Sequence, residues 1–143
     1  MHVAAILKDK GRSVESVGTD ASVMDVAARL SALRIGAVVV VDKDGNLAGI
    51  ISERDIIRVV GKDGTKALDW PVTDVMTRAV MTCREADTID QVMSVMTAGR
   101  FRHLPVLENG KLAGLISIGD VVKHRVAEAE MEATLMRDYI TAG

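Results

Sequence analysis

Two stretches of this sequence place a hydroxyl and a carboxylate three residues apart, directly after an apolar run. Ser52 precedes Asp55 in one stretch, and Ser117 precedes Asp120 in the other. The apolar runs predict strands and the residues after them predict helices, so both serines fall where a strand ends and a helix begins. Backbone N–H groups at a helix start favour an anionic or oxygen-rich ligand. The carboxylates can accept hydrogen bonds from vicinal hydroxyls, which is the chemistry that a ribose requires.

The same spacing also has a purely structural explanation. A serine at the N-cap with an acidic residue three positions later is a capping box, which satisfies the first N–H groups of a helix. Ser22 and Asp25 show this signature where no ligand is predicted. Spacing alone therefore favours helix capping, and ligand binding is the alternative.

The two stretches belong to an internal repeat that spans most of the chain. Thr88 follows Ser22 by 66 residues, whereas Ser117 follows Ser52 by 65. The missing residue falls in the turn between two predicted strands, where a deletion leaves the faces of the flanking strands in register. The repeat predicts two halves with the same order of elements.

Hydrophobic periodicity and turn residues predict an α+β fold in which each half reads strand, helix, strand, turn, strand, helix. A further short helix is expected at the N-terminus, and the last helix is long. The predicted elements are helices over 3–10, from 22, over 52–60, from 88 and from 117 to 140, a short helical or turn segment over 75–77, and strands over 13–17, 37–41, 47–51, 80–82, 104–107 and 112–116.

The two segments Gly49–Asp55 and Gly114–Asp120, together with the run from Arg102 to Val106, resemble the CBS domain, the cystathionine-β-synthase-type repeat. The resemblance covers about 13–123. It implies two tandem β-α-β-β-α repeats related by pseudo-two-fold symmetry, paired as a Bateman module. The expected division is 1–66 for the first repeat with the N-terminal segment, and 67–143 for the second repeat with the C-terminal helix.

The resemblance also implies a ligand, because the family's Ser and Asp face the ribose and phosphate of adenine nucleotides in the cleft between the repeats. AMP, ATP and NAD(H) are the expected ligands, and the module would sense energy or redox state and act on an unidentified partner protein. The candidate ribose- and phosphate-binding residues are Ser52, Arg54, Asp55, Arg100, Arg102, His103, Ser117 and Asp120. The candidate adenine-binding residues are Val14, Ile35, Ala79, Val80, Met81 and Phe101.

The repeats differ in the residues that open their second strand. The second repeat has Arg102 and His103 there, and the first has Gly36 and Ala37. An Arg-His pair at a strand's start is more often a solvated edge than a ligand site, but Arg and protonated His suit phosphate, and the resemblance favours that role. We therefore expect two unequal sites, of which the second repeat's is the better.

The predicted C-terminal helix carries apolar residues at spacings of 4, 3, 4, 3 and 4, which is the pattern of a helix-packing seam. The seam residues are Val122, Val126, Ala129, Ala133, Met136 and Ile140. Packing on the chain's own core is one interpretation. The pattern runs far beyond the repeat, which favours a homodimer contact.

Composition argues against several other classes of function. Eighteen basic and twenty acidic residues leave a net charge of −2, and only three aromatic residues are present, so no nucleic-acid partner is expected. The longest strongly apolar run, 37–41, is far shorter than the roughly 20 residues of a membrane span, and the N-terminus lacks a secretory pattern. A single cysteine permits no intrachain disulfide, so a cytoplasmic protein is expected.

An enzyme is not expected either. Cys83 and the three histidines, His2, His103 and His124, form no recognisable nucleophile–base set or metal-ligand spacing. Phosphate-binding glycine-rich motifs are missing from the sequence. Two functions stay open: a sensor of an adenosyl ligand, or a ligand-independent dimerisation or scaffolding module.

Overall fold

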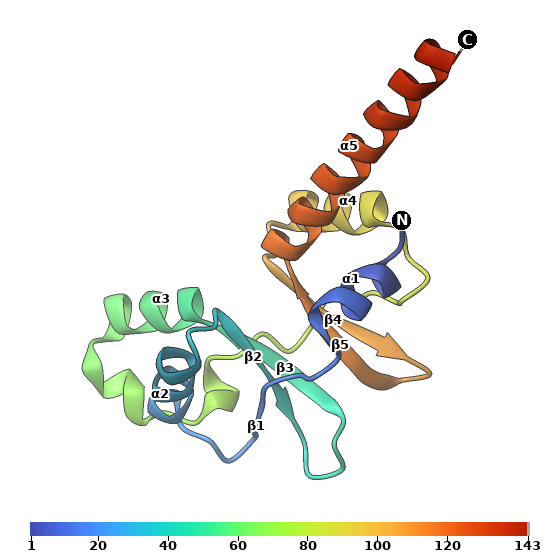
Figure 1. The fold of residues 1–143 in the computed structure, drawn as a ribbon. Helices are drawn as coiled ribbons and strands as arrows, with labels where there is room; N and C mark the ends of the chain where they lie inside the picture. Colours follow the sequence, from blue (N-terminus) through green and yellow to red (C-terminus); the bar gives the residue numbers. More distant parts are fainter. Residues whose placement is uncertain (143) are drawn as a thin grey trace. The chain divides into compact units, whose positions relative to one another are not determined.

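The structure, a computed structural model, describes residues 1–142 and contains two compact units (Figure 1). Unit 1 comprises Met1–Arg12, Thr82–Glu108 and the chain from Gly114 onward. Unit 2 comprises Ser13–Met81 together with Asn109–Ala113. These units differ from the sequence-based division at residue 66, because Met1–Arg12 packs with the second repeat and residues 67–81 pack with the first.

Unit 2 holds the first repeat. Its elements are β1 (Ser16–Gly18), α2 (Val23–Leu33), β2 (Ala37–Val41), β3 (Leu47–Ser52), α3 (Glu53–Asp63) and two short 3-10 helices, η1 (Thr65–Asp69) and η2 (Val72–Asp74). The three strands form one sheet in the order β1-β2-β3, with β1 parallel and β3 antiparallel to β2.

A buried apolar cluster joins the helices of unit 2 to this sheet. Helix α2 contributes Val26 and Leu30, which pack with Val38 and Val40 of β2 and with Ile51 of β3. The β-branched run that predicted a strand is therefore buried as expected. Burial of such side chains is the main favourable term in folding, at about 1.5–3 kcal/mol for each.

Unit 1 holds the second repeat and the N-terminal helix. Its elements are α1 (Val3–Lys10), α4 (Ile89–Gly99), β4 (His103–Glu108), α5 (Ile118–Ala142) and, from Gly114 onward, β5 (Lys111–Ser117). Strands β4 and β5 are joined by Asn109 and Gly110, whose φ angles are 52° and 77°. Two successive positive φ angles in an Asn-Gly pair are typical of a tight hairpin turn. The core of unit 1 includes Ile6, Leu104 and Ile116.

The strand predicted over 80–82 is wrong, because residues 80–82 are in no strand and the chain next to them makes only a single bridge, between Cys83 and Val106. Comparison with the first repeat explains why this strand does not form. In unit 2 the backbone N–H of Val39 donates to the carbonyl of Glu15 at 3.2 Å. The residue 66 positions after Val39 is Pro105, which has no N–H to donate, so the corresponding ladder bond cannot form. The strand predicted over 13–17 is shorter and later, at Ser16–Gly18.

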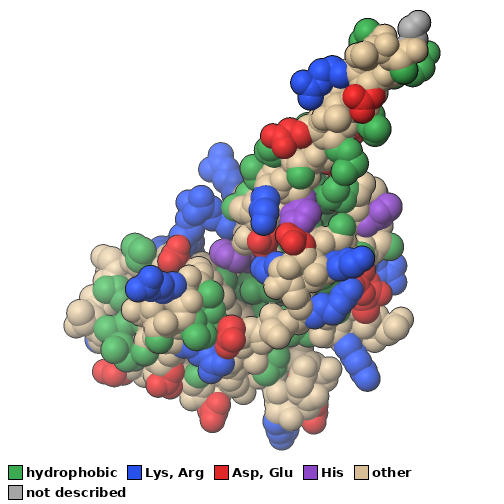
Figure 2. Space-filling view, in the orientation of Figure 1, with side chains coloured by type: hydrophobic (Ala, Val, Ile, Leu, Met, Phe, Trp, Pro, Cys, Tyr) green, Lys and Arg blue, Asp and Glu red, His purple; other side chains and the backbone are tan. Residues whose placement is uncertain are grey.

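Helix α5 is 25 residues long, and its C-terminal part extends away from the rest of its own unit (Figure 1). Only Val121 within it is buried. Hydrophobic side chains are visible along this extension in Figure 2, and Val126, Met136 and Ile140 are each more than half exposed. The apolar seam predicted from the sequence is therefore uncovered in the single chain.

Within residues 1–142, no helix is both long enough and apolar enough to cross a membrane.

Candidate ligand site

Ser117 and Asp120 form a capping box at the start of α5. The Oδ2 atom of Asp120 accepts a hydrogen bond from the Ser117 N–H at 2.9 Å, and the Asp120 N–H donates to Ser117 Oγ at 3.1 Å. Ser22 and Asp25 make the same two bonds, at 2.9 and 3.1 Å. The capping interpretation is therefore correct for both pairs, and only the surroundings can distinguish a ligand site from a plain cap.

A lysine from α1 contacts Asp120, and this contact distinguishes the surroundings of Asp120 from those of Asp25. Lys10 Nζ donates to Asp120 Oδ2 at 2.7 Å and to the backbone carbonyl of Leu115 at 2.9 Å. Burial would raise the pKa of Asp120, but the hydrogen bond from Lys10, the bonds from Ser117 and the lysine's charge outweigh it, so the pKa lies below its ordinary value. Sequence reasoning missed Lys10, because no pattern relates residues 110 positions apart.

The basic residues of the second repeat lie at the same helix start. The N–H of Ile118, the first residue of α5, donates to the Arg102 carbonyl at 2.8 Å. The Arg102 side chain is exposed, and His103 is half-buried as the first residue of β4. The structure therefore brings the backbone of Arg102 beside the Ser117/Asp120 cap. The role of Arg102 and His103 in binding phosphate stays a prediction.

Arg100 and Phe101 come directly before this pair. Arg100 caps α4 in the left-handed conformation, with a φ of 57°. The ring of Phe101 lies against Gly99, where an added Cβ would come within 2.1 Å of it. Gly99 therefore makes room for the only phenylalanine of the chain, which is half-buried.

The first repeat has the same backbone arrangement with different side chains. Asp55 Oδ2 accepts hydrogen bonds from the N–H and hydroxyl of Ser52, at 2.9 and 3.1 Å. The Glu53 N–H donates to the carbonyl of Gly36 at 2.9 Å, as Ile118 does to Arg102. A glycine and a glutamate thus stand where the second repeat has an arginine and an isoleucine, so this helix start has less positive charge.

Arg54 and Ile35 also lie at this helix start. Arg54 is exposed in the first turn of α3. Ile35 lines a cavity of about 560 Å³ between α2 and α3, together with Gly36 and Glu53. Val14 comes two residues before β1, whose Ser16 pairs with Val39, so the strand register places Val14 near Ala37 at the same end of the sheet.

The remaining adenine candidates, Ala79, Val80 and Met81, form the irregular last segment of unit 2. Ala79 and Met81 are exposed, and Val80 is half-buried. The structure assigns them no strand, and their role in binding a base stays a prediction.

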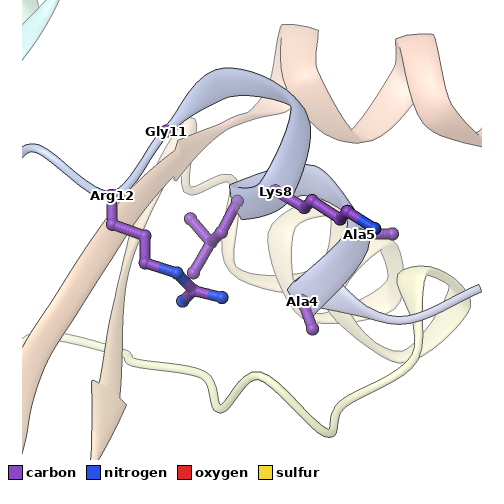
Figure 3. Close-up of a pocket in the computed structure, with 6 residues that line it drawn as sticks. Ala4, Ala5, Lys8, Gly11 and Arg12 are labelled. Atoms are coloured by element: carbon purple, nitrogen blue, oxygen red, sulfur yellow. The ribbon is translucent and has the colours of Figure 1, made fainter.

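A second cavity of about 600 Å³ lies over α1 in unit 1 (Figure 3). Its lining residues all come from α1 and the two residues after it: Ala4, Ala5, Leu7, Lys8, Gly11 and Arg12. The Arg12 guanidinium forms an ion pair with Glu85 of the same unit. None of the predicted site residues lines this cavity.

Cys83 is poorly suited to nucleophilic chemistry. Burial, with a contribution from the charge of Asp87, raises the pKa of the Cys83 thiol to about 12. The thiol is therefore protonated at neutral pH, and the thiolate is the reactive form. Among residues 1–142, no group of three or more His, Cys, Asp or Glu side chains is placed to hold a metal ion.

Similar proteins support the architecture seen here. The chain is 34% identical over 150 residues to the CBS domain-containing protein CBSX3, mitochondrial, of Arabidopsis thaliana, a match that covers 99% of this chain and 72% of that protein. It is 50% identical to a CBS-domain containing protein from Agrobacterium tumefaciens, with a TM-score of 0.85 over 87% of this chain and 99% of that one.

Two more distant solved structures share the fold and contain ligands. CBSX2 in complex with AMP is 24% identical, with a TM-score of 0.71 over 82% of this chain and 90% of that one. A CBS domain pair in complex with 5′-methylthioadenosine and S-adenosyl-L-methionine is 23% identical, with a TM-score of 0.79 over 90% and 98%. At this identity the likeness establishes the fold alone.

The model of the CBS domain matches this chain twice, over residues 7–62 and 72–127. The two matches coincide with the two halves of the repeat and contain both Ser/Asp pairs and the Arg-His pair. This chain therefore belongs to the CBS-domain family.

Proposed function

We propose that this chain is a regulatory module that binds an adenine nucleotide and acts on a partner protein. The observation that carries the proposal is the start of α5. There the Ser117/Asp120 cap, the backbone of Arg102 and His103, and the Lys10 ammonium meet in one unit. The carboxylate of Asp120 suits ribose hydroxyls, and the basic side chains suit a phosphate.

The ligands in related structures support an adenosyl compound as the ligand class. AMP, 5′-methylthioadenosine and S-adenosyl-L-methionine, found in two CBS structures, share adenine and a ribose. Among adenosyl ligands we favour a phosphorylated one, AMP, ATP or NAD(H), because S-adenosyl-L-methionine carries a cationic sulfonium, which suits a carboxylate-rich site better than one with Arg102 and Lys10.

The proposed module is regulatory rather than catalytic, so ligand binding is expected to change its affinity for a partner protein. A ligand shifts a two-state equilibrium only by its difference in affinity for the two states. An adenine nucleotide present in proportion to energy or redox state would set the fraction of modules in the partner-binding state. We propose the cytoplasm as its location, as the sequence predicts.

A thermal-shift panel of AMP, ADP, ATP, NAD(H) and S-adenosyl-L-methionine tests the ligand class. A ligand that binds only the folded state at 100 times its Kd stabilises it by about 2.7 kcal/mol, so a bound nucleotide raises the Tm measurably. The proposal requires a larger shift with at least one phosphorylated adenosyl ligand than with S-adenosyl-L-methionine. A Tm unchanged by every compound in the panel would refute it.

A ligand-independent dimerisation module is the second candidate, and two observations favour it. Both Ser/Asp pairs are satisfied as helix caps, like Ser22 and Asp25, so neither needs a ligand. The exposed seam of α5 also offers a contact surface. Calorimetry with adenosine and AMP discriminates the two candidates, since the scaffold binds neither compound.

The α5 seam supports a homodimer under either candidate. With Val126, Ala133 and Ile140 at the a positions of a heptad, Glu132 falls at g and Arg137 at the following e. In a parallel, in-register pair of helices, g of one chain faces the next e of the other, so these side chains form opposite-charge contacts across the seam. We therefore propose a parallel α5 pairing with a second copy.

A further inference from the structure

One oxygen of the proposed ribose-binding carboxylate already has two donors. Asp120 Oδ2 accepts from the Ser117 N–H at 2.9 Å and from Lys10 Nζ at 2.7 Å. Each carboxylate oxygen offers about two lone-pair directions. The acceptor capacity of Oδ2 is therefore filled when the lysine is in place.

A ribose presents two vicinal hydroxyls, and a carboxylate that binds both uses one oxygen for each. The Oδ1 atom can serve one hydroxyl while Lys10 stays where it is. The second hydroxyl must take the lone-pair direction on Oδ2 that Lys10 occupies, since the Ser117 N–H belongs to the helix cap. Binding both hydroxyls at Asp120 therefore requires that the lysine leave this oxygen.

Lys10 is held at Asp120 by the way α1 docks within unit 1. The N–H groups of Val3 and Ala4 donate to the carbonyls of Asp87 and Glu85, at 2.9 and 3.0 Å. At the other end of α1, Asp9 forms an ion pair with Lys123 of α5 at 3.6 Å, and its carboxylate lies 3.5 Å from Nε2 of His124. Leu7 packs against Gly114 of β5, where an added Cβ would come within 2.6 Å of its side chain. The lysine is therefore positioned before any ligand arrives.

The first repeat has no equivalent lysine. The backbone bonds that dock α1 recur in unit 2 at an offset of 69 residues, since the Val72 N–H donates to the carbonyl of Ala21 as the Val3 N–H does to that of Asp87. The position equivalent to Lys10 is therefore Ala79, an exposed residue without a charged side chain. Asp55 receives its hydrogen bonds from Ser52 and from the exposed Arg58 of its own helix. The contact from α1 is therefore a feature of the second repeat's site.

We propose that Lys10 is an affinity-setting residue of the ligand site, a latch that one ribose hydroxyl displaces from Asp120. Displacement frees the lysine from Asp120 and loosens the last turn of α1, so ligand occupancy is transmitted to the N-terminal helix. This inference rests on the proposed function, because it assigns the ribose to Asp120.

Calorimetry with adenosine tests the latch, because an uncharged ligand does not respond to the lost lysine charge through long-range attraction. Lys10→Met keeps the apolar stem and removes the ammonium, so adenosine should bind at least threefold more tightly than it binds the wild type. Lys10→Arg keeps a donor and should stay near wild-type affinity. Lys8→Met, an exposed lysine of the same helix, is the matched control and should leave the affinity unchanged.

Amide hydrogen exchange provides a second test. If Lys10 had only a structural role, ligand binding would not change the exchange rate at the end of α1. The Gly11 N–H donates to the carbonyl of Leu7 at 2.8 Å and reports on the last turn of α1. Adenosine should speed exchange at this amide in the wild type, and should have no such effect in Lys10→Met, where the latch is already open.

The outcomes separate the latch from the proposed function. An adenosine affinity that is unchanged or weaker in Lys10→Met, while the wild type binds, overturns the latch alone. Gly11 exchange that slows or stays constant on binding overturns it as well. Failure of every chain, wild type and variants, to bind adenosine, AMP or NAD(H) overturns the proposed function and the latch together.

Discussion

The helix starts of the two repeats share a backbone and differ in their charges. At α5 the Asp120 carboxylate is bonded to a lysine ammonium from α1, and the carbonyl that receives the first helical N–H belongs to Arg102. At α3 the corresponding carbonyl belongs to Gly36, and the first helical residue is Glu53. The two helices also differ in length, 11 residues against 25.

This difference shows which part of the motif is structural and which part is available for binding. The Ser/Asp cap is made in both repeats, and again at Ser22 and Asp25, so it is needed for the helix whether or not a ligand binds. The side chains of Lys10 and Arg102 take no part in the cap, and the first repeat has no counterpart of either. This difference predicts that the second repeat dominates binding of phosphorylated ligands.

The largest effect on AMP affinity is expected at Asp120, and Asp55 provides the comparison. Asp120→Ala should weaken AMP binding by about 10- to 100-fold, the scale of hydrogen bonds to a charged group, at about 1.5–3 kcal/mol. Asp55→Ala should weaken it by less than about threefold, the effect of about 0.6 kcal/mol. Calorimetry measures both values.

Asp25→Ala controls for the loss of a cap. It should cost about 1 kcal/mol of unfolding free energy, as capping substitutions do, without changing AMP affinity. Equal losses of AMP affinity in Asp55→Ala and Asp120→Ala would contradict the comparison between the repeats.

Substitution at the α5 seam tests the difference in helix length. Ala133→Glu places like charges at facing a positions, so the dimer dissociation constant should rise by at least about tenfold, or about 1.4 kcal/mol. Sedimentation velocity over a concentration series measures this constant. Leu135→Glu lies on the other side of the helix and should leave it unchanged. A chain that stays equally dimeric in both variants does not pair through this seam.

Arg102→Ala tests whether the charge difference between the repeats acts on phosphate. AMP affinity should fall about fivefold to tenfold, because a charge-assisted hydrogen bond to phosphate is lost, while adenosine affinity changes by less than about twofold. Arg34→Ala removes the first-repeat counterpart of Arg100 and serves as the control, with both affinities retained. If adenosine and AMP weaken alike, Arg102 does not contact the phosphate.

The smallest effect concerns pH. The pKa of Asp120 is lowered in the folded state, so its stabilising contribution is complete above its ordinary pKa and is lost as the pH falls through the lowered value. Lys10→Met removes the largest of the interactions that lower this pKa, so the pKa of Asp120 should rise. Unfolding by acid should then begin at a higher pH. An NMR titration of the Asp120 carboxyl checks the direction, and a fall in its pKa would contradict the ion pair.

Local features of the fold were predictable because their causes lie within a few residues. The capping boxes at Ser22, Ser52 and Thr88 depend on a partner three positions away, and the structure confirms all three. The turn at Asn109 and Gly110 depends on two residues that tolerate positive φ. Membership of the CBS family could also be inferred from the sequence, since the repeat places the same motif at the end of each half.

The errors arose where one residue altered a pattern that the rest of the sequence supports. The apolar residues at 80–82 match a strand, but the partner strand carries Pro105 at the position that would donate the ladder bond. The sequence itself carries this signal, since Val39 in the first repeat has the N–H that Pro105 lacks.

By itself, the sequence determined the duplicated order of elements, the capped helix starts and the charge difference between Arg102 and Gly36, because each depends on residue type and short spacing. Only the tertiary structure decided that α1 packs with the second repeat and that its Lys10 reaches Asp120. That contact joins residues 110 positions apart, and it depends on how a helix docks against a hairpin rather than on any periodicity along the chain. The same packing left the α5 seam exposed.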